Sequence, residues 1–274
     1  FFENTFSFTS SSSKYKAIDS VQKNLISLAN ELITRGHQVI IYNNIKKNKT
    51  ENNIEWRKIS EIPESRYKTE ILIICDDEEL ISIDIEAKMK LFWVTSELNT
   101  NNYEKTLINL LKNKFIILHS SFHIISRLPK NFNYVPKIFM EIGVNKSFFG
   151  VKNHNVTKCQ ALVTSHPLRG LDWLLDIWVN LISLKLPWAE MHIFSKTLFS
   201  EKKSNNIKIN NLKFKLIKYK NNGIIIKEPL PEKEFVKVLC DYKVHLSPCK
   251  NENIFFTSIL ESQASGIPVV SRYN

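Results

Sequence analysis

A helix near the end of the chain carries residues suited to binding a phosphorylated ligand. Thr257 or Ser258 is expected to begin this helix, because either hydroxyl can accept a hydrogen bond from an early backbone N–H group. The N–H groups from Thr257 to Ile259 then lack partners within the helix and favour a phosphate. Glu261 lies one turn further on, where its carboxylate can accept hydrogen bonds from a ribose. This spacing predicts a site for a sugar nucleotide.

The residues around this helix predict one β-α-β unit of a parallel sheet. Residues 243–247 form a short stretch typical of a buried strand, and residues 248–253 form the polar loop after it. Gly266 is expected to end the helix, and residues 267–271 return as the next strand. Because parallel sheets bind ligands outside the carboxyl ends of their strands, the loop and the helix start lie where a ligand is expected.

Glu261 and the run Ala264-Ser-Gly-Ile-Pro-Val-Val270 resemble the donor site of GT-B glycosyltransferases, in particular the retaining family-four type. That family's signature is two glutamates separated by seven residues, followed by a helix of small residues, a glycine, a proline and a Val-Val strand. Counted back from Glu261, the first glutamate's position holds Asn253, and Glu252 lies one residue earlier. The resemblance implies that either Glu252, through a shifted loop, or the Asn253 amide contacts the donor sugar. It also implies that the nucleotide is bound by Thr257, Ser258 and Glu261.

A second stretch suited to binding phosphate follows a predicted strand at residues 160–164. Gly170 breaks the chain between this strand and a helix, and Arg169 lies in the break. A guanidinium can bind phosphate oxygens with two parallel hydrogen bonds, whereas a cation at a helix start is unfavourable unless an anion lies nearby. The stretch resembles the family's first turn in its second domain, which implies that Ser165 and Arg169 contact the donor diphosphate. Thr164 stands where the family has a further arginine.

The first half of the chain alternates predicted strands with helices, among them a long amphipathic helix that ends at Gly36. His119 and His123 follow a predicted strand on the side where a ligand cleft should lie, and their role is left open. In the second half, lysines alternate with apolar residues over 213–220, which favours a half-exposed strand. The strands predicted in the first half are residues 4–9, 38–42, 70–75, 90–94 and 114–118.

The order of these elements predicts the α/β class and, by resemblance, the GT-B fold, in which two Rossmann-like domains with parallel sheets face a cleft. Residues 142–149 resemble the family's crossing between the two domains. We therefore expect residues 1–145 to form an N-terminal, acceptor-side domain and residues 146–274 to form a C-terminal, nucleotide-sugar-binding domain. Because the chain lacks an initial methionine and stops directly after a predicted strand, we expect a fragment whose C-terminal domain is incomplete.

Composition limits the class of protein further. The chain has 274 residues, of which 43% are hydrophobic and 24% charged, as is usual for soluble globular proteins. No apolar run approaches the ~20 residues that a membrane-spanning helix needs. The four cysteines are scattered without a zinc or disulfide spacing, so we expect reduced thiols and a cytoplasmic protein.

The formal net charge of +11 has one simple and two functional explanations. Lysines spread over solvated faces account for it most simply. The functional explanations are attraction to anionic lipid headgroups, worth about 1 kcal/mol per basic residue near the surface, and attraction to nucleic acid. We expect no nucleic-acid partner, and a peripheral contact with the inner face of an anionic membrane is left open.

Together these features predict a retaining hexosyltransferase. By resemblance, it moves a hexose from a nucleotide diphosphate sugar to a glycan or lipid-linked acceptor, in the synthesis of cell-surface polysaccharide or glycolipid, without a cofactor or a bound metal. The resemblance gives the catalytic roles to Glu252 and Arg169. Two alternatives remain: a non-catalytic GT-B-like binding subunit, which the altered first glutamate and the missing arginine favour, and a basic nucleic-acid-binding protein.

Overall fold

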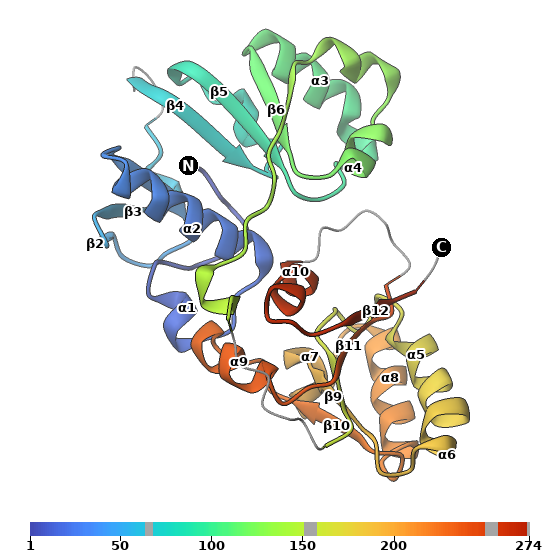
Figure 1. Ribbon diagram of the computed structural model, residues 1–274. Helices are drawn as coiled ribbons and strands as arrows, with labels where there is room; N and C mark the ends of the chain where they lie inside the picture. Colours follow the sequence, from blue (N-terminus) through green and yellow to red (C-terminus); the bar gives the residue numbers. More distant parts are fainter. Residues whose placement is uncertain (64–67, 151–157, 250–256, 273–274) are drawn as a thin grey trace. The chain divides into compact units, whose positions relative to one another are not determined.

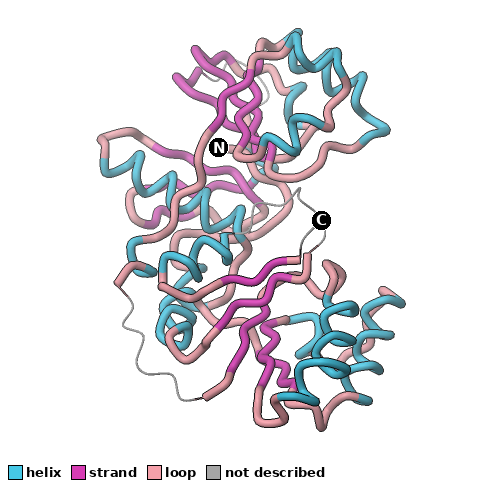
Figure 2. The backbone as a smooth tube through the Cα atoms, turned by 45° about the vertical axis from the view of Figure 1, so that its right-hand side comes forward, coloured by secondary structure: helices cyan, strands magenta, loops and turns pink. Residues whose placement is uncertain are grey.

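The chain folds into two compact units. The computed structural model describes residues 1–63, 68–150, 158–249 and 257–272. Within these ranges, the first unit holds residues 1–12 and 19–143, and the second holds 13–18, 144–150, 158–249 and 257–272. Each unit is built on largely parallel sheets with helices packed against them, as the magenta strands and cyan helices of Figure 2 show.

The first unit contains two sheets (Figure 1). Its strands are β1 (Val39–Asn43), β2 (Lys49–Glu51), β3 (Ile54–Lys58), β4 (Lys68–Cys75), β5 (Glu86–Val94), β6 (Phe115–His119) and β7 (Lys137–Phe139). The four-stranded sheet runs β4-β5-β6-β7 and is fully parallel. The three-stranded sheet runs β1-β3-β2, with β2 antiparallel to β3. The predicted strands that follow residue 37 in this half of the chain are therefore present, although their ends differ by a few residues.

The amino-terminal residues join the two sheets of the first unit. Phe2 pairs with Tyr42 of β1 and with Ile74 of β4, and its backbone N–H donates to the Ile73 carbonyl at 2.9 Å. The prediction of a strand at residues 4–9 is wrong, because the residue that pairs with both strands is Phe2 and residues 4–9 form no strand. The apolar side chain of Phe2 is 3% exposed, so burial favours pairing at this position.

The helices of the first unit cover its sheets. They are α2 (Ser20–Thr34), α3 (Tyr103–Lys112) and α4 (Phe122–Ser126), with 3₁₀ turns at Ile59–Glu61, Leu80–Ser82, Thr100–Asn102 and Lys130–Tyr134. The short helix α1 (Ser12–Tyr15) lies where the chain passes between units. Asp19 caps α2: its carboxylate accepts from the Gln22 N–H at 3.0 Å, while the Gln22 side chain accepts from the Asp19 N–H at 3.3 Å. This reciprocal capping fixes the start of the long predicted helix.

The second unit is one fully parallel, five-stranded sheet in the order β10-β9-β8-β11-β12. Its strands are β8 (Gln160–Val163), β9 (Glu190–Phe194), β10 (Ile224–Lys227), β11 (Val244–Ser247) and β12 (Val269–Ser271). Its helices are α5 (Leu171–Ile177), α6 (Ser183–Lys185), α7 (Lys196–Phe199), α8 (Ile207–Lys218), α9 (Glu232–Leu239) and α10 (Thr257–Ala264). A 3₁₀ turn at Lys146–Phe148 and a π-helical segment at Trp178–Ile182 complete the unit.

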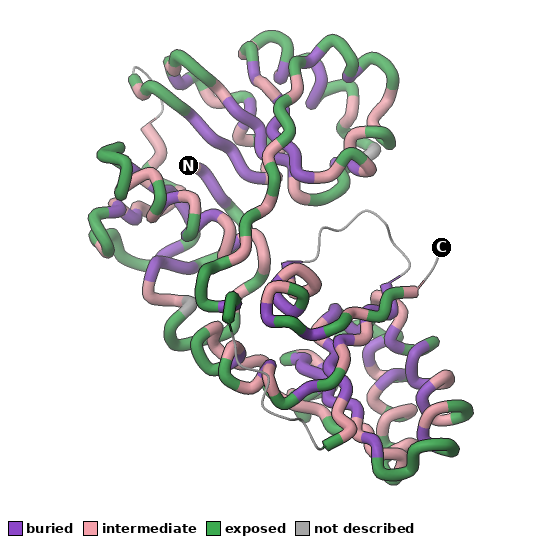
Figure 3. Tube along the Cα trace, viewed as in Figure 1, coloured by how far each residue is buried: buried purple, intermediate pink, exposed green. Residues whose placement is uncertain are grey.

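Two apolar clusters cover the two faces of this sheet. Ala161 and Val163 of β8 belong to the cluster that includes the buried residues of α5 and α8. Leu162, between them in the strand, belongs to the other cluster with Phe235 and Leu239 of α9. Because neighbouring residues of a strand point to opposite faces, α5 and α8 pack on one face and α9 on the other. Buried residues, purple in Figure 3, make up most of β8 and β9, the two strands that these clusters cover.

Residues 213–220 do not form the predicted strand. Residues 207–218 form α8, whose amino end is capped by the Asn206 side chain, an acceptor from the Lys208 N–H at 2.9 Å. Ile209 and Leu212 are buried and Leu216 packs beside them, a spacing of three and four residues that gives one helix face. Over the second half of the helix, lysines alternate with apolar residues, and this alternation is also typical of a strand. The prediction is therefore wrong.

Gly223 gives a test of the packing at the start of β10. Gly223 and Gly150 both have φ of +69°, but a Cβ atom on Gly223 would lie 2.2 Å from the Ala189 carbonyl oxygen, whereas one on Gly150 meets nothing within 4 Å. We expect Gly150→Ala to cost about 1 kcal/mol of unfolding free energy from backbone strain alone. Gly223→Ala should cost about 3 kcal/mol, because the backbone must also move. Urea unfolding of both variants measures the difference, and equal losses would contradict the close contact.

Candidate functional site

The candidate site lies at the carboxyl ends of the strands in the second unit. The chain leaves β8 toward β9 on one side, and β11 later pairs on the other side of β8. The helix after β8 is α5, which packs on one face, and the helix after β11 is α10, whose Ala264 contacts the cluster on the opposite face. In parallel sheets, ligands bind at the carboxyl edge where the strand order reverses in this way.

The turn between β8 and α5 lies against the end of β11. Gly170 has a φ of +92°, and a Cβ atom there would lie 2.2 Å from the carbonyl oxygen of Pro248. Glycine allows this approach because it has no side chain and tolerates left-handed φ. Arg169 precedes Gly170, and its backbone N–H donates to the His166 carbonyl at 2.9 Å. The turn therefore places Arg169 at the point of strand reversal.

Two polar neighbours of Arg169 belong to the same turn. Ser165 is 9% exposed, and its hydroxyl has no hydrogen-bond partner within the described ranges. Nδ1 of His166 accepts from the Leu168 N–H at 3.3 Å. Partial burial and, second, the positive charge of Arg169 lower the pKa of His166. His166 is therefore neutral at pH 7, and Arg169 is the cation of this turn.

Helix α10 supplies the other predicted residues that the structure describes. The helix begins at Thr257, so Ser258 is its second residue and Glu261 its fifth. Thr257 and Glu261 lie four residues apart, on one face of the helix, and each is 5% exposed. The structure thus brings Thr257, Ser258 and Glu261 together on the helix that follows β11, while their contacts with a nucleotide stay a prediction.

Glu252 and Asn253 lie outside the described residues. The structure therefore does not choose between the Glu252 carboxylate and the Asn253 amide as the group that contacts the donor sugar. Both alternatives stay open, as they do in the sequence.

A buried chain of polar side chains links the two halves of the site. His245 of β11 is 1% exposed, its Nε2 lies 3.1 Å from the Thr164 hydroxyl oxygen, and its Nδ1 lies 2.9 Å from the Ser262 hydroxyl oxygen. Burial lowers the pKa of His245 to about 4. The ring is therefore neutral at pH 7, with one nitrogen donating and the other accepting. Since Thr164 precedes Ser165 and Ser262 follows Glu261, His245 holds both predicted binding segments in place.

Sequence reasoning missed the role of His245. The available signal is a histidine within the otherwise apolar middle of a predicted strand at residues 243–247. A polar ring buried there costs free energy unless both nitrogens find partners, so partners at neighbouring strand ends and helices could have been sought.

The carboxyl edge of the four-stranded sheet in the first unit also carries polar side chains. Asp76 follows β4 with a φ of +51°, and its carboxylate accepts from the Thr95 N–H at 2.7 Å and the Ser96 N–H at 3.3 Å. Burial raises the pKa of Asp76, against these hydrogen bonds, which lower it. His119 at the end of β6 is 3% exposed, and burial lowers its pKa. Asp76 thus fixes the loop after β5, and the role of His119 stays open.

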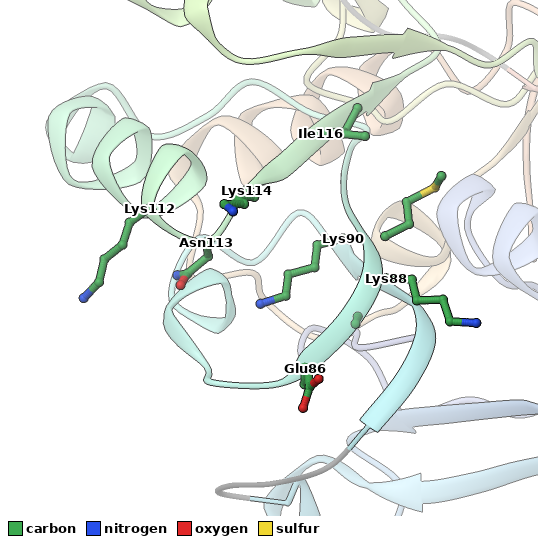
Figure 4. Close-up of a pocket in the computed structure, with 9 residues that line it drawn as sticks. Glu86, Lys88, Lys90, Lys112, Asn113, Lys114 and Ile116 are labelled. Carbon is green, nitrogen blue, oxygen red and sulfur yellow. The ribbon is translucent and has the colours of Figure 1, made fainter.

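A lysine-lined pocket lies at the opposite edge of that sheet, at the amino ends of β5 and β6 (Figure 4). Lys88 pairs with Glu70 at 2.7 Å, and its side chain points away from Lys90 in Figure 4. The lining has no pair of groups suited to nucleophilic or acid–base catalysis, so the pocket is not the candidate catalytic site. Its residues are Glu86, Ala87, Lys88, Met89, Lys90, Lys112, Asn113, Lys114 and Ile116.

Two kinds of feature are missing from the part of the chain that the structure describes. No group of three or more His, Cys, Asp or Glu side chains there could hold a metal ion. No described helix combines the length and the apolar character needed to cross a bilayer.

Comparison with known proteins finds similarity in structure. No protein-family model and no curated protein matches the sequence. Sucrose-phosphate synthase from Thermosynechococcus elongatus matches with a TM-score of 0.70 at 10% identity, over 93% of this chain and 76% of that one. A glycosyltransferase from Rickettsia africae ESF-5 matches with a TM-score of 0.66 at 14% identity, over 98% and 77%. WaaG, a glycosyltransferase involved in lipopolysaccharide biosynthesis, matches with a TM-score of 0.59 at 12% identity, over 94% and 78%.

These similarities establish the fold. The chain has the fold of GT-B glycosyltransferases, which confirms the α/β, GT-B prediction made from the sequence. At identities this low the likeness shows the fold alone. The family-four type, retention, the donor and the acceptor stay predictions.

His245 predicts how the stability of the second unit depends on pH. Its pKa is about 4 in the folded chain against an ordinary 6.5, so the unfolded state takes up a proton first as the pH falls. Stability is complete above pH 6.5 and falls toward pH 4, with His245 contributing on the order of 3 kcal/mol of that loss.

The His245→Gln variant provides the comparison, because an amide donates and accepts hydrogen bonds but does not titrate in this range. Urea unfolding at pH 7 and pH 5 should show a smaller drop in unfolding free energy for the variant than for the wild type. Equal drops in the two proteins would show that His245 is not buried as described.

Proposed function

We propose that the protein is a retaining glycosyltransferase that moves a hexose from a nucleotide diphosphate sugar to a glycan or lipid-linked acceptor. Sugar transfer as the reaction class is supported by the fold, which the chain shares with a sucrose-phosphate synthase and two glycosyltransferases. The single observation that carries the proposal is the close approach of the Arg169 turn to the end of β11, where Gly170 lies against Pro248. This contact sets a cation at the strand reversal, where parallel sheets hold nucleotides.

The chemistry of sugar transfer explains why a cation is needed there. The bond between the anomeric carbon and the diphosphate oxygen breaks with its electron pair left on that oxygen, and the acceptor oxygen bonds to the carbon while its proton passes to the departing diphosphate. Negative charge grows on the departing diphosphate, so positive groups aimed at it lower the barrier. We assign this role to Arg169 and to the backbone N–H groups at the start of α10.

The remaining predicted residues act on other parts of the donor. Glu261 accepts hydrogen bonds from the ribose, and the donor sugar is positioned by Glu252 or Asn253. Ser165 belongs to the same turn as Arg169, and its buried hydroxyl is suited to a phosphate oxygen. We propose no metal and no further cofactor.

The acceptor and the location follow from the same proposal. One structural neighbour is described as a glycosyltransferase involved in lipopolysaccharide biosynthesis, which supports a role in the synthesis of cell-surface polysaccharide or glycolipid. A lipid-linked acceptor would bring a cytoplasmic protein to the inner face of the membrane. The net charge of +11 would favour a peripheral contact with anionic lipids there.

One observation favours a non-catalytic binding subunit instead. Thr164 stands where the family has an arginine, and its hydroxyl is within hydrogen-bond distance of His245. The turn after β8 therefore has one arginine, Arg169, among the described residues. A nucleotide-binding subunit without turnover is the second candidate, and the two experiments below separate it from the enzyme.

A thermal-shift screen tests the donor site. The chain is mixed with UDP, GDP, ADP and CMP and with their common sugars, and its melting temperature is measured. A ligand at a hundred times its dissociation constant should stabilise the protein by about 2.7 kcal/mol, a shift of a few degrees. One diphosphate should give this shift, and Glu261→Ala should abolish it, because the ribose loses its acceptor.

The buried position of Glu261 calls for a control. Glu261→Gln keeps the size of the side chain and should melt near the wild type without ligand, while the shift with the diphosphate shrinks. No shift with any nucleotide would rule out a working donor pocket.

Turnover by the purified chain tests the role of Arg169. Arg169→Ala should lower kcat/KM for the donor by about a hundredfold to a thousandfold, because the growing negative charge loses its cation. Glu252→Gln should also lower turnover if the carboxylate, rather than Asn253, positions the sugar. Full turnover in both variants would refute the site assignment. Binding of the nucleotide without turnover in the wild type would favour the binding subunit.

A further inference from the structure

A second arginine lies at the same edge of the sheet in the second unit. Arg272 directly follows β12, and its guanidinium carbon lies 4.2 Å from the centre of the Trp173 ring. Trp173 is in the first turn of α5 and is 36% exposed, so the stacked pair is open to solvent on one side. A guanidinium over an indole ring is attracted by the ring's negative face, which favours this position of the Arg272 side chain.

The position of Arg272 bridges the strand reversal. Its backbone N–H donates to the carbonyl of Ser247, the last residue of β11, at 3.2 Å. Its side chain reaches Trp173 on α5, the helix that follows β8, although β12 is separated from β8 by β11. The side chain therefore crosses the carboxyl end of β11. Trp173 is the third residue of α5, the helix that starts directly after Arg169 and Gly170, so Arg169 and the partner of Arg272 belong to the same turn-and-helix segment.

The stack leaves the hydrogen-bonding groups of Arg272 usable. A guanidinium contacts an aromatic ring through its face, whereas its N–H donors lie in its plane. No described residue accepts a hydrogen bond from these donors. The two carboxylates of α5, those of Asp172 and Asp176, each lie 2.7 Å from the Lys215 ammonium. Arg272 can thus present two parallel donors to a phosphate while it stays stacked.

We infer that Arg272 binds the diphosphate of the donor together with Arg169, and that Trp173 is a positioning residue that aims Arg272 at it. The inference rests on the proposed function, because it names a further group that binds the same ligand. Each phosphate of a sugar-linked diphosphate carries a negative charge, so two arginines on the two sides of β11 match the ligand's charge. A purely structural stack would clamp β12 to α5 and would not distinguish one nucleotide from another.

Titration calorimetry with a series of nucleotides separates these two roles. The probes are the diphosphate that gives the largest thermal shift, the monophosphate of the same base, and the nucleoside. Arg272→Ala should weaken the diphosphate about tenfold to a hundredfold, the monophosphate less, and the nucleoside not at all. Arg272→Lys should lie in between, since an ammonium keeps the charge but loses the paired donors and the planar stack.

Two further variants control for stability and for charge. Trp173→Leu should weaken the diphosphate by a smaller factor than Arg272→Ala and leave the nucleoside unchanged, because Arg272 is still present but no longer aimed. Lys185→Ala removes one positive charge at the opposite, amino-terminal edge of the same unit, and should leave all three affinities unchanged.

The outcomes distinguish the inference from the function on which it rests. If the wild type binds none of the nucleotides, the proposed function is wrong and the inference falls with it. If the wild type binds the diphosphate and Arg272→Ala binds it equally well, the inference alone is wrong. A loss of affinity in Arg272→Ala that is the same for nucleoside, monophosphate and diphosphate would show a structural clamp and would also overturn it.

Discussion

The reversal of strand order between β8 and β11 is the constraint on which the candidate site depends. Because β-α-β crossovers are right-handed, a chain that builds outward in one direction and then in the other must place its helices on opposite faces. The apolar clusters of the second unit show this arrangement, with α5 and α8 on one face and α9 on the other. The starts of α5 and α10 then lie on the two sides of one edge. Every predicted binding residue that the structure describes belongs to this edge.

The strand reversal alone does not fix the distance between the start of α5 and the start of α10. Two contacts at the carboxyl edge of the sheet fix it. Gly170 lies directly against the Pro248 carbonyl, which fixes the turn after β8 in the direction of β11. His245 joins Thr164 to Ser262, which fixes the same turn relative to α10. The first contact is steric and the second is a pair of hydrogen bonds inside the protein, where a broken bond leaves a polar group without water. The two contacts therefore hold the turn after β8 in position against Pro248 and α10.

Local signals in the sequence predict much of this structure. The amphipathic pattern that ends at Gly36 predicts α2, and the short apolar runs predict the parallel strands. The two wrong predictions of strands have one cause. In each, a short segment has a pattern typical of a strand, while residues outside the segment determine the structure. Residues 213–220 fit an alternating pattern as well as part of a helix, and the cap at Asn206, outside the window, decides for α8. Near the amino end, the segment at residues 4–9 resembles a strand, but the gap between β1 and β4 is filled by Phe2.

In the candidate site, too, residues that lie in short sequence motifs could be predicted, whereas contacts between distant segments could not. Glu261, Ser165 and Arg169 are visible in sequence because each lies in a short motif. The partners of His245 lie far from it along the chain. Arg272 and Trp173 are also distant in sequence and come into contact only in the folded sheet. Contacts between distant segments carry no local spacing, so sequence pattern cannot supply them.

The left-handed conformation of Gly170 affects which residues evolution can change at this turn. Selection for a folded chain is sufficient to keep a glycine there, whether or not the protein still transfers a sugar, because any side chain would collide with the Pro248 carbonyl. Arg169, its neighbour, does not have the left-handed φ that favours glycine. In a lineage that had lost activity, the glycine would persist while the arginine drifted. Among related sequences, a glycine at position 170 would therefore indicate the conserved fold, whereas an arginine at position 169 would indicate that activity has been kept.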